Sequence, residues 1–162
     1  MARWQFRPPV ERVKHGFRIN LDTEERDLLV RLIGELRGLL VGPDDHPALV
    51  RLFPTAYHQP EHAAKDEEFR RLMRDELVAS RLAAIEQVEQ ALVSKPPLAE
   101  QQVLALAQAL NAVRLVLGTM LDVSEDHDPD TVAEDDPMVG EYHLYGFLSW
   151  LLEWTVRSLT GT

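Results

Sequence analysis

The sequence predicts a mainly α-helical protein, a single-domain bundle of about five helices with an N-terminal β-hairpin or extended arm. Residues 103–121 are apolar nearly all round, with Arg114 as their one charge, and a helix of this kind must be surrounded by other elements. Elsewhere, apolar residues such as Leu29, Leu32 and Leu36 recur at the spacing of an amphipathic helix. A chain of 162 residues is long enough for one domain with a substantial core.

The first 21 residues, 1–21, differ from the rest of the chain. Residues 17–21 alternate between apolar and polar side chains, as a half-buried strand does. His15 and Gly16 form a turn signal just before them. Because two strands alone are marginally stable, we expect this hairpin or arm to pack against the helices.

The predicted helices follow in order along the chain. The first begins at Asp22, because Asp22 and Glu25 have the spacing of a capping box, and it ends at Gly42. A short helix or turn is expected over residues 47–53 and a long helix over residues 66–92.

The long helix combines an apolar stripe with a row of basic side chains. The stripe consists of Phe69, Leu72, Met73 and Leu77, and the basic row of Arg70, Arg71, Arg74 and Arg81. A DNA-reading helix could use such a row, but carboxylates on the same turns favour a solvated face with ion pairs four residues apart. The net charge of −10 also argues against broad nucleic-acid binding, and direct DNA binding stays open.

Two strongly apolar helices close the chain, with an acidic loop between them. The central helix runs from Leu98 to Leu121, and the last helix begins at Pro137. Residues 122–136 contain eight carboxylates and neither Lys nor Arg, which predicts a solvated, mobile loop. The loop lacks the glycine and the glutamate that a calcium-binding loop needs at fixed positions.

The last helix is more apolar than one small core requires. Part of it, around Trp150 and Trp154, is therefore expected to face another subunit, because large exposed apolar patches usually mark an interface. Homodimers are the commonest oligomers, so we expect a homodimer. Trp4, in the basic N-terminal arm, is a third candidate interface residue.

Arg114 is the one charged residue of the apolar stretch 103–121, and a buried guanidinium needs a partner or a route to water. We expect a structural ion pair between Arg114 and Glu153, with Glu141 as second choice, because both acids lie on the other apolar helix. The alternative is a ligand pocket in which Asn111 and Arg114 bind an anionic small molecule.

Several classes of chemistry have no support in the sequence. The chain has no cysteine, which excludes disulfides and thiolate catalysis. We find no serine-nucleophile, phosphate-loop or zinc-protease motif, so we expect no catalytic residues, no metal and no cofactor. The N-terminus lacks the apolar region of a signal peptide and no stretch is long enough to span a membrane, which favours the cytoplasm.

The order of several segments is similar to one actinobacterial family. These segments are FRINLDTEERDLLVRLIGEL, LVRLFPTAY, EFRRLMRDEL, LNAVRLVLGTML and YHLYGFLSWLLEW. Together they resemble the AosR family, oxidative-stress transcriptional regulators long described as a domain of unknown function. The resemblance implies a cytoplasmic, non-enzymatic regulator with a partner in the transcription or proteolysis machinery. The redox role of the family depends on a cysteine pair that this chain lacks.

The expected function is therefore regulation through protein–protein interaction, with the last helix or the N-terminal arm as contact surface. The first alternative is a sensor of small anions with a pocket near Arg114. The second, less favoured, is a metal-dependent hydrolase.

Overall fold

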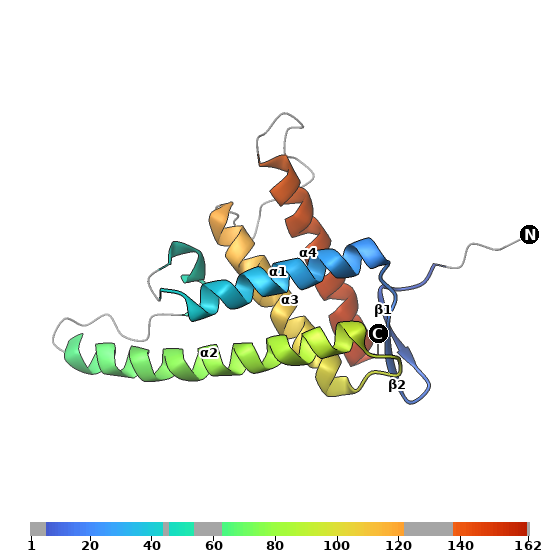
Figure 1. Ribbon diagram of the computed structural model, residues 1–162, viewed down its shortest axis with the longest axis horizontal. Helices are drawn as coiled ribbons and strands as arrows, with labels where there is room; N and C mark the ends of the chain where they lie inside the picture. Colours follow the sequence, from blue (N-terminus) through green and yellow to red (C-terminus); the bar gives the residue numbers. More distant parts are fainter. Residues whose placement is uncertain (1–5, 44–45, 54–62, 122–137, 162) are drawn as a thin grey trace, which may run out of the picture.

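The computed structural model describes residues 6–43, 46–53, 63–121 and 138–161. The mainly helical fold with an N-terminal hairpin is confirmed (Figure 1). In the described part of the chain it comprises four α-helices and one short 3₁₀-helix. The elements are β1 (Val10–Val13), β2 (Gly16–Ile19), α1 (Thr23–Val41), η1 (Pro47–Leu49), α2 (Ala63–Val93), α3 (Glu100–Met120) and α4 (Val139–Thr160).

The hairpin packs against the helices, as expected. Strands β1 and β2 pair antiparallel, with the turn at His15, whose φ is 71°. Phe17 exchanges two backbone hydrogen bonds with Leu98, of 3.0 and 2.8 Å, just before α3. On the other side, Arg12 donates from Nε to the carbonyl oxygen of Ser158 at 3.0 Å. These contacts fix a hairpin that would be marginal alone.

The boundaries of α1 are those the sequence predicts. The Glu25 backbone N–H donates to Asp22 Oδ1 at 2.8 Å, and the Asp22 N–H donates to Glu25 Oε1 at 3.1 Å. This reciprocal pair satisfies two N–H groups that no helical carbonyl can reach. Gly42 caps the other end.

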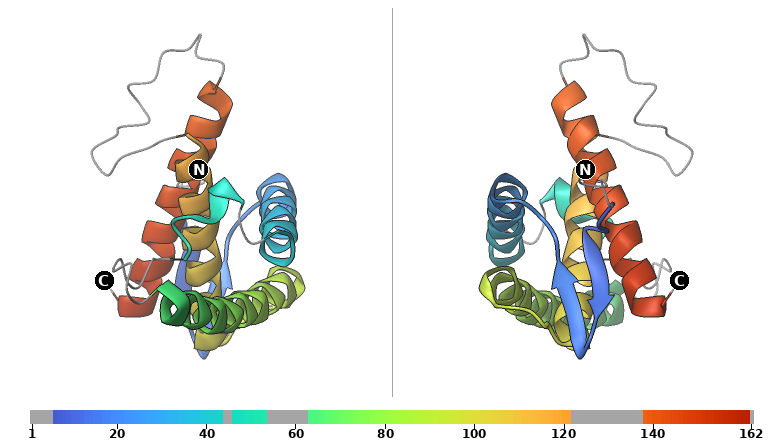
Figure 2. Two further views of the ribbon diagram at one scale, coloured as in Figure 1. Left: turned by 90° about the vertical axis from the view of Figure 1, so that its left-hand side faces the viewer. Right: turned by 90° about the vertical axis from the view of Figure 1, so that its right-hand side faces the viewer.

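Helix α3 is the centre of the molecule. It lies between α4 on one side and α1 and α2 on the other (Figure 2), and it also contacts η1 and β2. Val103 and Leu106 are completely buried. By length and composition α3 could cross a membrane, but half of its most apolar window is buried inside the protein. The predicted central helix is therefore the core helix of the bundle.

The two remaining long helices lie at the outside. Helix α2 begins at Ala63, earlier than expected, and its N-terminal half projects beyond the other helices (Figure 1). Helix α4 packs on α3 and β1. The predicted acidic loop over residues 122–136 and the candidate interface residue Trp4 lie outside the described residues.

Candidate functional site

The predicted ion pair between Arg114 and Glu153 is wrong. Arg114 Nη2 donates instead to Asn111 Oδ1 at 3.1 Å, three residues away on the same helix. Glu153 accepts from Arg157 Nη2 at 2.8 Å, on the exposed side of α4. An exposed carboxylate with an arginine four residues later already has a partner nearby. Glu141, the second choice, forms no ion pair with Arg114 either.

Arg114 lies where α3 packs against α4, close to Asn111 and Ser149. We call these three residues the polar seam. Tyr142 Oη donates to the Leu121 carbonyl at 3.3 Å, and a Cβ atom at Gly118 would lie 3.2 Å from Tyr145 Cε2. These two contacts show that α3 and α4 run antiparallel, and the same alignment places Ser149 opposite Arg114. Arg114 Nε and Ser149 Oγ are both buried without a hydrogen-bond partner. The seam therefore keeps polar atoms away from water where α3 and α4 meet.

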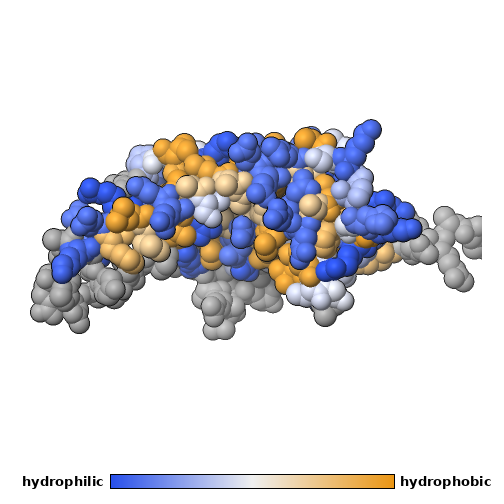
Figure 3. All heavy atoms as spheres, turned by 90° about the horizontal axis from the view of Figure 1, so that it is seen from below, coloured by the Kyte–Doolittle hydropathy of each residue, from blue (hydrophilic) through white to orange (hydrophobic). Residues whose placement is uncertain are grey.

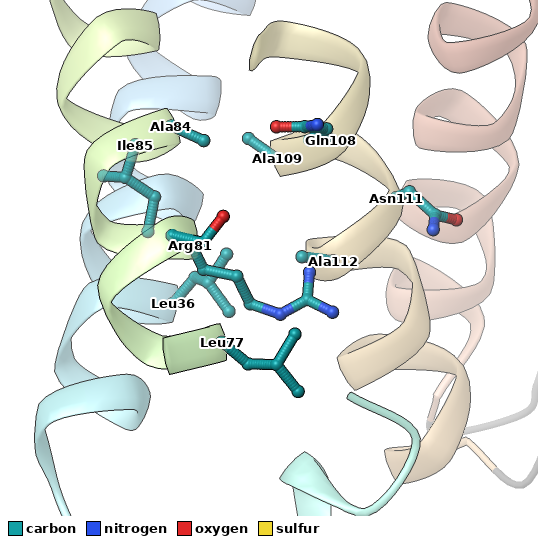
Figure 4. Close-up of a pocket in the computed structure, with 10 residues that line it drawn as sticks. Leu36, Leu77, Arg81, Ala84, Ile85, Gln108, Ala109, Asn111 and Ala112 are labelled. Atoms are coloured by element: carbon teal, nitrogen blue, oxygen red, sulfur yellow. The ribbon is translucent and has the colours of Figure 1, made fainter. Parts of the chain in front are cut away.

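A cavity of about 230 Å³ lies on the opposite side of α3, where α2 crosses it (Figure 4). Asn111 borders this cavity, but its side chain turns away, toward α4 and Arg114. Arg114 is not among the lining residues; the arginine of this cavity is Arg81 of α2. This cavity therefore does not bring Asn111 and Arg114 together, and a ligand pocket formed by these two residues stays a prediction.

Arg81 crosses from α2 toward Ala112 of α3 (Figure 4). Its Nη2 donates to the Leu52 carbonyl at 3.5 Å, while its Nε is buried without a partner. Burial lowers the pKa of the Arg81 guanidinium, because desolvation disfavours the charged form. The sequence signal for this position is its spacing of four residues before the buried Ile85, which places both on the inner side of α2.

Two residues of the predicted interface, Trp150 and Trp154, lie on α4. Trp150 is 39% exposed, and its ring centroid lies 6.0 Å from that of Phe147. Trp154 is instead half-covered: the Phe6 ring lies 5.4 Å from it and the Arg157 guanidinium 5.1 Å. The exposed aromatic face of α4 is thus centred on Trp150 and Phe147.

A second exposed apolar surface lies on the projecting half of α2. Leu72 is 61% exposed, Phe69 41% and Met73 40%, and they occupy adjacent turns of one helix face. We call these three residues the α2 stripe. In Figure 3, which shows the underside of the molecule, small apolar clusters are separated by polar side chains, and one cluster lies at the end where α2 begins. Leu77, the fourth member of the predicted stripe, lines the Arg81 cavity instead.

Within the described segments, no group of three or more His, Asp or Glu side chains could hold a metal ion. A protein-family model, a domain of unknown function named DUF2017, matches the chain over residues 1–159. The chain belongs to the DUF2017 family. No curated protein and no solved structure matches it.

Proposed function

We propose that this DUF2017 protein is a non-enzymatic regulatory protein of the cytoplasm that acts by binding a protein of the transcription or proteolysis machinery. The exposed α2 stripe carries this proposal. The class of partner comes from the resemblance to the AosR family. Because the chain has no cysteine, its regulation does not use the thiol chemistry of that family.

The α2 stripe is unusual for a helix end that projects into water. Further along α2, Ile85 and Val88 are buried against the rest of the bundle, as expected for an amphipathic helix. The α2 stripe has the same spacing of three or four residues, but it lies on the part of α2 that the other helices do not cover. A partner helix with its own apolar row fits such a surface, in the manner of helix-in-groove recognition. Nearby exposed charges of both signs, among them Arg71 and Asp75, would form the polar rim of the contact.

The α2 stripe can be tested by charge substitution. We expect Leu72→Glu to reduce recovery of transcription or proteolysis proteins on the tagged full-length chain at least about tenfold, because a buried charge in an apolar contact costs well over 1.4 kcal/mol. Quantitative mass spectrometry of captured proteins would measure this. Val30→Glu is the matched control, since Val30 is an exposed apolar residue in the middle of α1. Equal recovery with both variants would contradict the proposal.

The aromatic face of α4 supports a second contact, between two copies of the chain. Residues 142–152 of α4 contain no Asp, Glu, Lys or Arg, yet α4 is an outer helix whose Trp150 and Phe147 are only partly covered. Interface cores are depleted of charge and enriched in aromatic residues. We therefore expect a homodimer with this face of α4 at its centre.

Truncation of the central aromatic side chain tests the homodimer. We expect Trp150→Ala to weaken self-association by a factor of about 30, because a central interface tryptophan typically contributes about 2 kcal/mol or more. Sedimentation equilibrium of the wild type and the variant would give both dissociation constants. Val156→Ala, an exposed apolar position elsewhere on α4, should dimerise like the wild type. A wild-type protein that stays monomeric at high micromolar concentration would rule this interface out.

A further inference from the structure

The cavity beside Arg81 arises because three small side chains lie where α2 and α3 face each other. These are Ala84, Ala109 and Ala112, all buried. Larger residues at these positions would fill the space between two packed helices. The resulting volume of about 230 Å³ is far larger than the water-sized voids of an ordinary protein interior. A cavity of this size, continuous with the surface, has room for a small ligand.

The charge in this cavity has no compensating partner. None of the carboxylates in the described segments forms an ion pair with Arg81, and its one hydrogen bond, to Leu52, is at the outer limit of length. Its Nε donor is buried and unused. A guanidinium does not lose its proton in proteins, so desolvation here is costly until an anion arrives.

We propose that this cavity binds a small organic carboxylate with an apolar body. The carboxylate pairs with the Arg81 guanidinium, a geometry in which two N–H groups can be used at once. The apolar body fills the space against Leu36, Ile85 and Ala112. One water molecule occupies about 30 Å³ in the liquid, so the cavity has room for roughly eight water-sized groups. Hexanoate, with its six carbons and two oxygens, is a molecule of about this size. The exposed side chains of Ser80 and Gln108 lie at its rim.

The apolar walls decide between anions. A phosphate ion would bind the guanidinium, but apart from Ser80 and Gln108 at the rim its other oxygens would lie against alanine and leucine side chains, which is unfavourable. A carboxylate with a hydrocarbon chain pairs with the Arg81 guanidinium through its charged end and packs against the apolar side chains through its chain. This site is separate from the α2 stripe and the aromatic face of α4. A negative result for ligand binding would therefore leave the proposed function untouched, and failure of the proposed function would leave this site untouched.

The test is a binding titration of the full chain with hexanoate, hexanol, acetate and inorganic phosphate, by calorimetry. We expect hexanoate to bind in the millimolar range or tighter, and hexanol, acetate and phosphate each at least about tenfold more weakly. Arg81→Met should weaken hexanoate binding at least about tenfold. Arg31→Met, an exposed arginine of α1, should leave it unchanged. Ala84→Leu, which places a larger side chain in the cavity and keeps the Arg81 guanidinium, should also abolish binding.

Each other outcome overturns the proposal. If the wild type does not bind hexanoate, or Arg81→Met binds it equally well, Arg81 serves only to hold the segment after η1 through the Leu52 carbonyl. If hexanol binds as well as hexanoate, the charge plays no part. If phosphate binds as tightly as hexanoate, the apolar body plays none. Should Arg81→Met fail to fold, Ala84→Leu decides: retained binding places the ligand elsewhere.

Discussion

Replacement of Arg26 by Met is expected to lower the free energy of unfolding by about 3–5 kcal/mol. The Arg26 guanidinium donates to three backbone carbonyls: those of Ile19 at 2.7 Å, Leu92 at 2.8 Å and Leu21 at 3.1 Å. These oxygens belong to β2, to the end of α2 and to the segment between β2 and α1. Loss of the arginine leaves all three carbonyls without this donor at the point where the hairpin and two helices meet. Met keeps the helix propensity of the site, so the loss reports these contacts.

Chemical denaturation followed by circular dichroism measures the effect of Arg26→Met. The control is Arg31→Met on the exposed side of the same helix, which should change the unfolding free energy by less than about 0.5 kcal/mol. Arg26→Lys should recover little, because a single ammonium cannot reach three carbonyls in different directions. Similar midpoints for Arg26→Met and Arg31→Met would show that Arg26 does not hold these elements together.

The parts of the fold that the sequence predicts correctly are those set by neighbouring residues. Asp22 and Glu25 are three residues apart, so their capping box is visible in the sequence. The hairpin likewise follows from the turn at His15 and Gly16 and the alternation after it. Local hydrogen bonds and local periodicity need no knowledge of the tertiary fold.

The arginine contacts could not be predicted in the same way. Arg26 reads in the sequence as an ordinary charge in the first turns of α1, yet one of its acceptors, Leu92, is 66 residues away. Arg81 reads as one member of a basic row, and only the packing of α2 on α3 reveals that it is half-buried. An arginine can donate in five directions, so its partners depend on which backbone segments the fold brings close.

The error at Arg114 has a different cause. The expected pair with Glu153 is a contact between two helices, whereas each of the two residues has a local partner on its own helix. Glu153 has Arg157 one turn later, and Arg114 has Asn111 one turn earlier. Interactions three or four residues apart are available in any helix. Both local pairs have this spacing, which is visible in the sequence.

A second large effect is expected at the centre of α3. Leu106→Ala should lower the free energy of unfolding by about 2–5 kcal/mol, because Leu106 is completely buried and its truncation removes apolar contacts and opens a cavity. Thermal and denaturant unfolding of the full chain would measure the change.

Leu104 provides the matched control for Leu106, two positions earlier on the same helix. It is 49% exposed, so Leu104→Ala should cost less than about 1 kcal/mol. Both substitutions have the same effect on helix propensity, so the difference between them reports the burial of one face of α3. Equal losses at the two positions would mean that α3 is not surrounded as described, and the polar seam and the Arg81 cavity on its two sides would lose their structural basis.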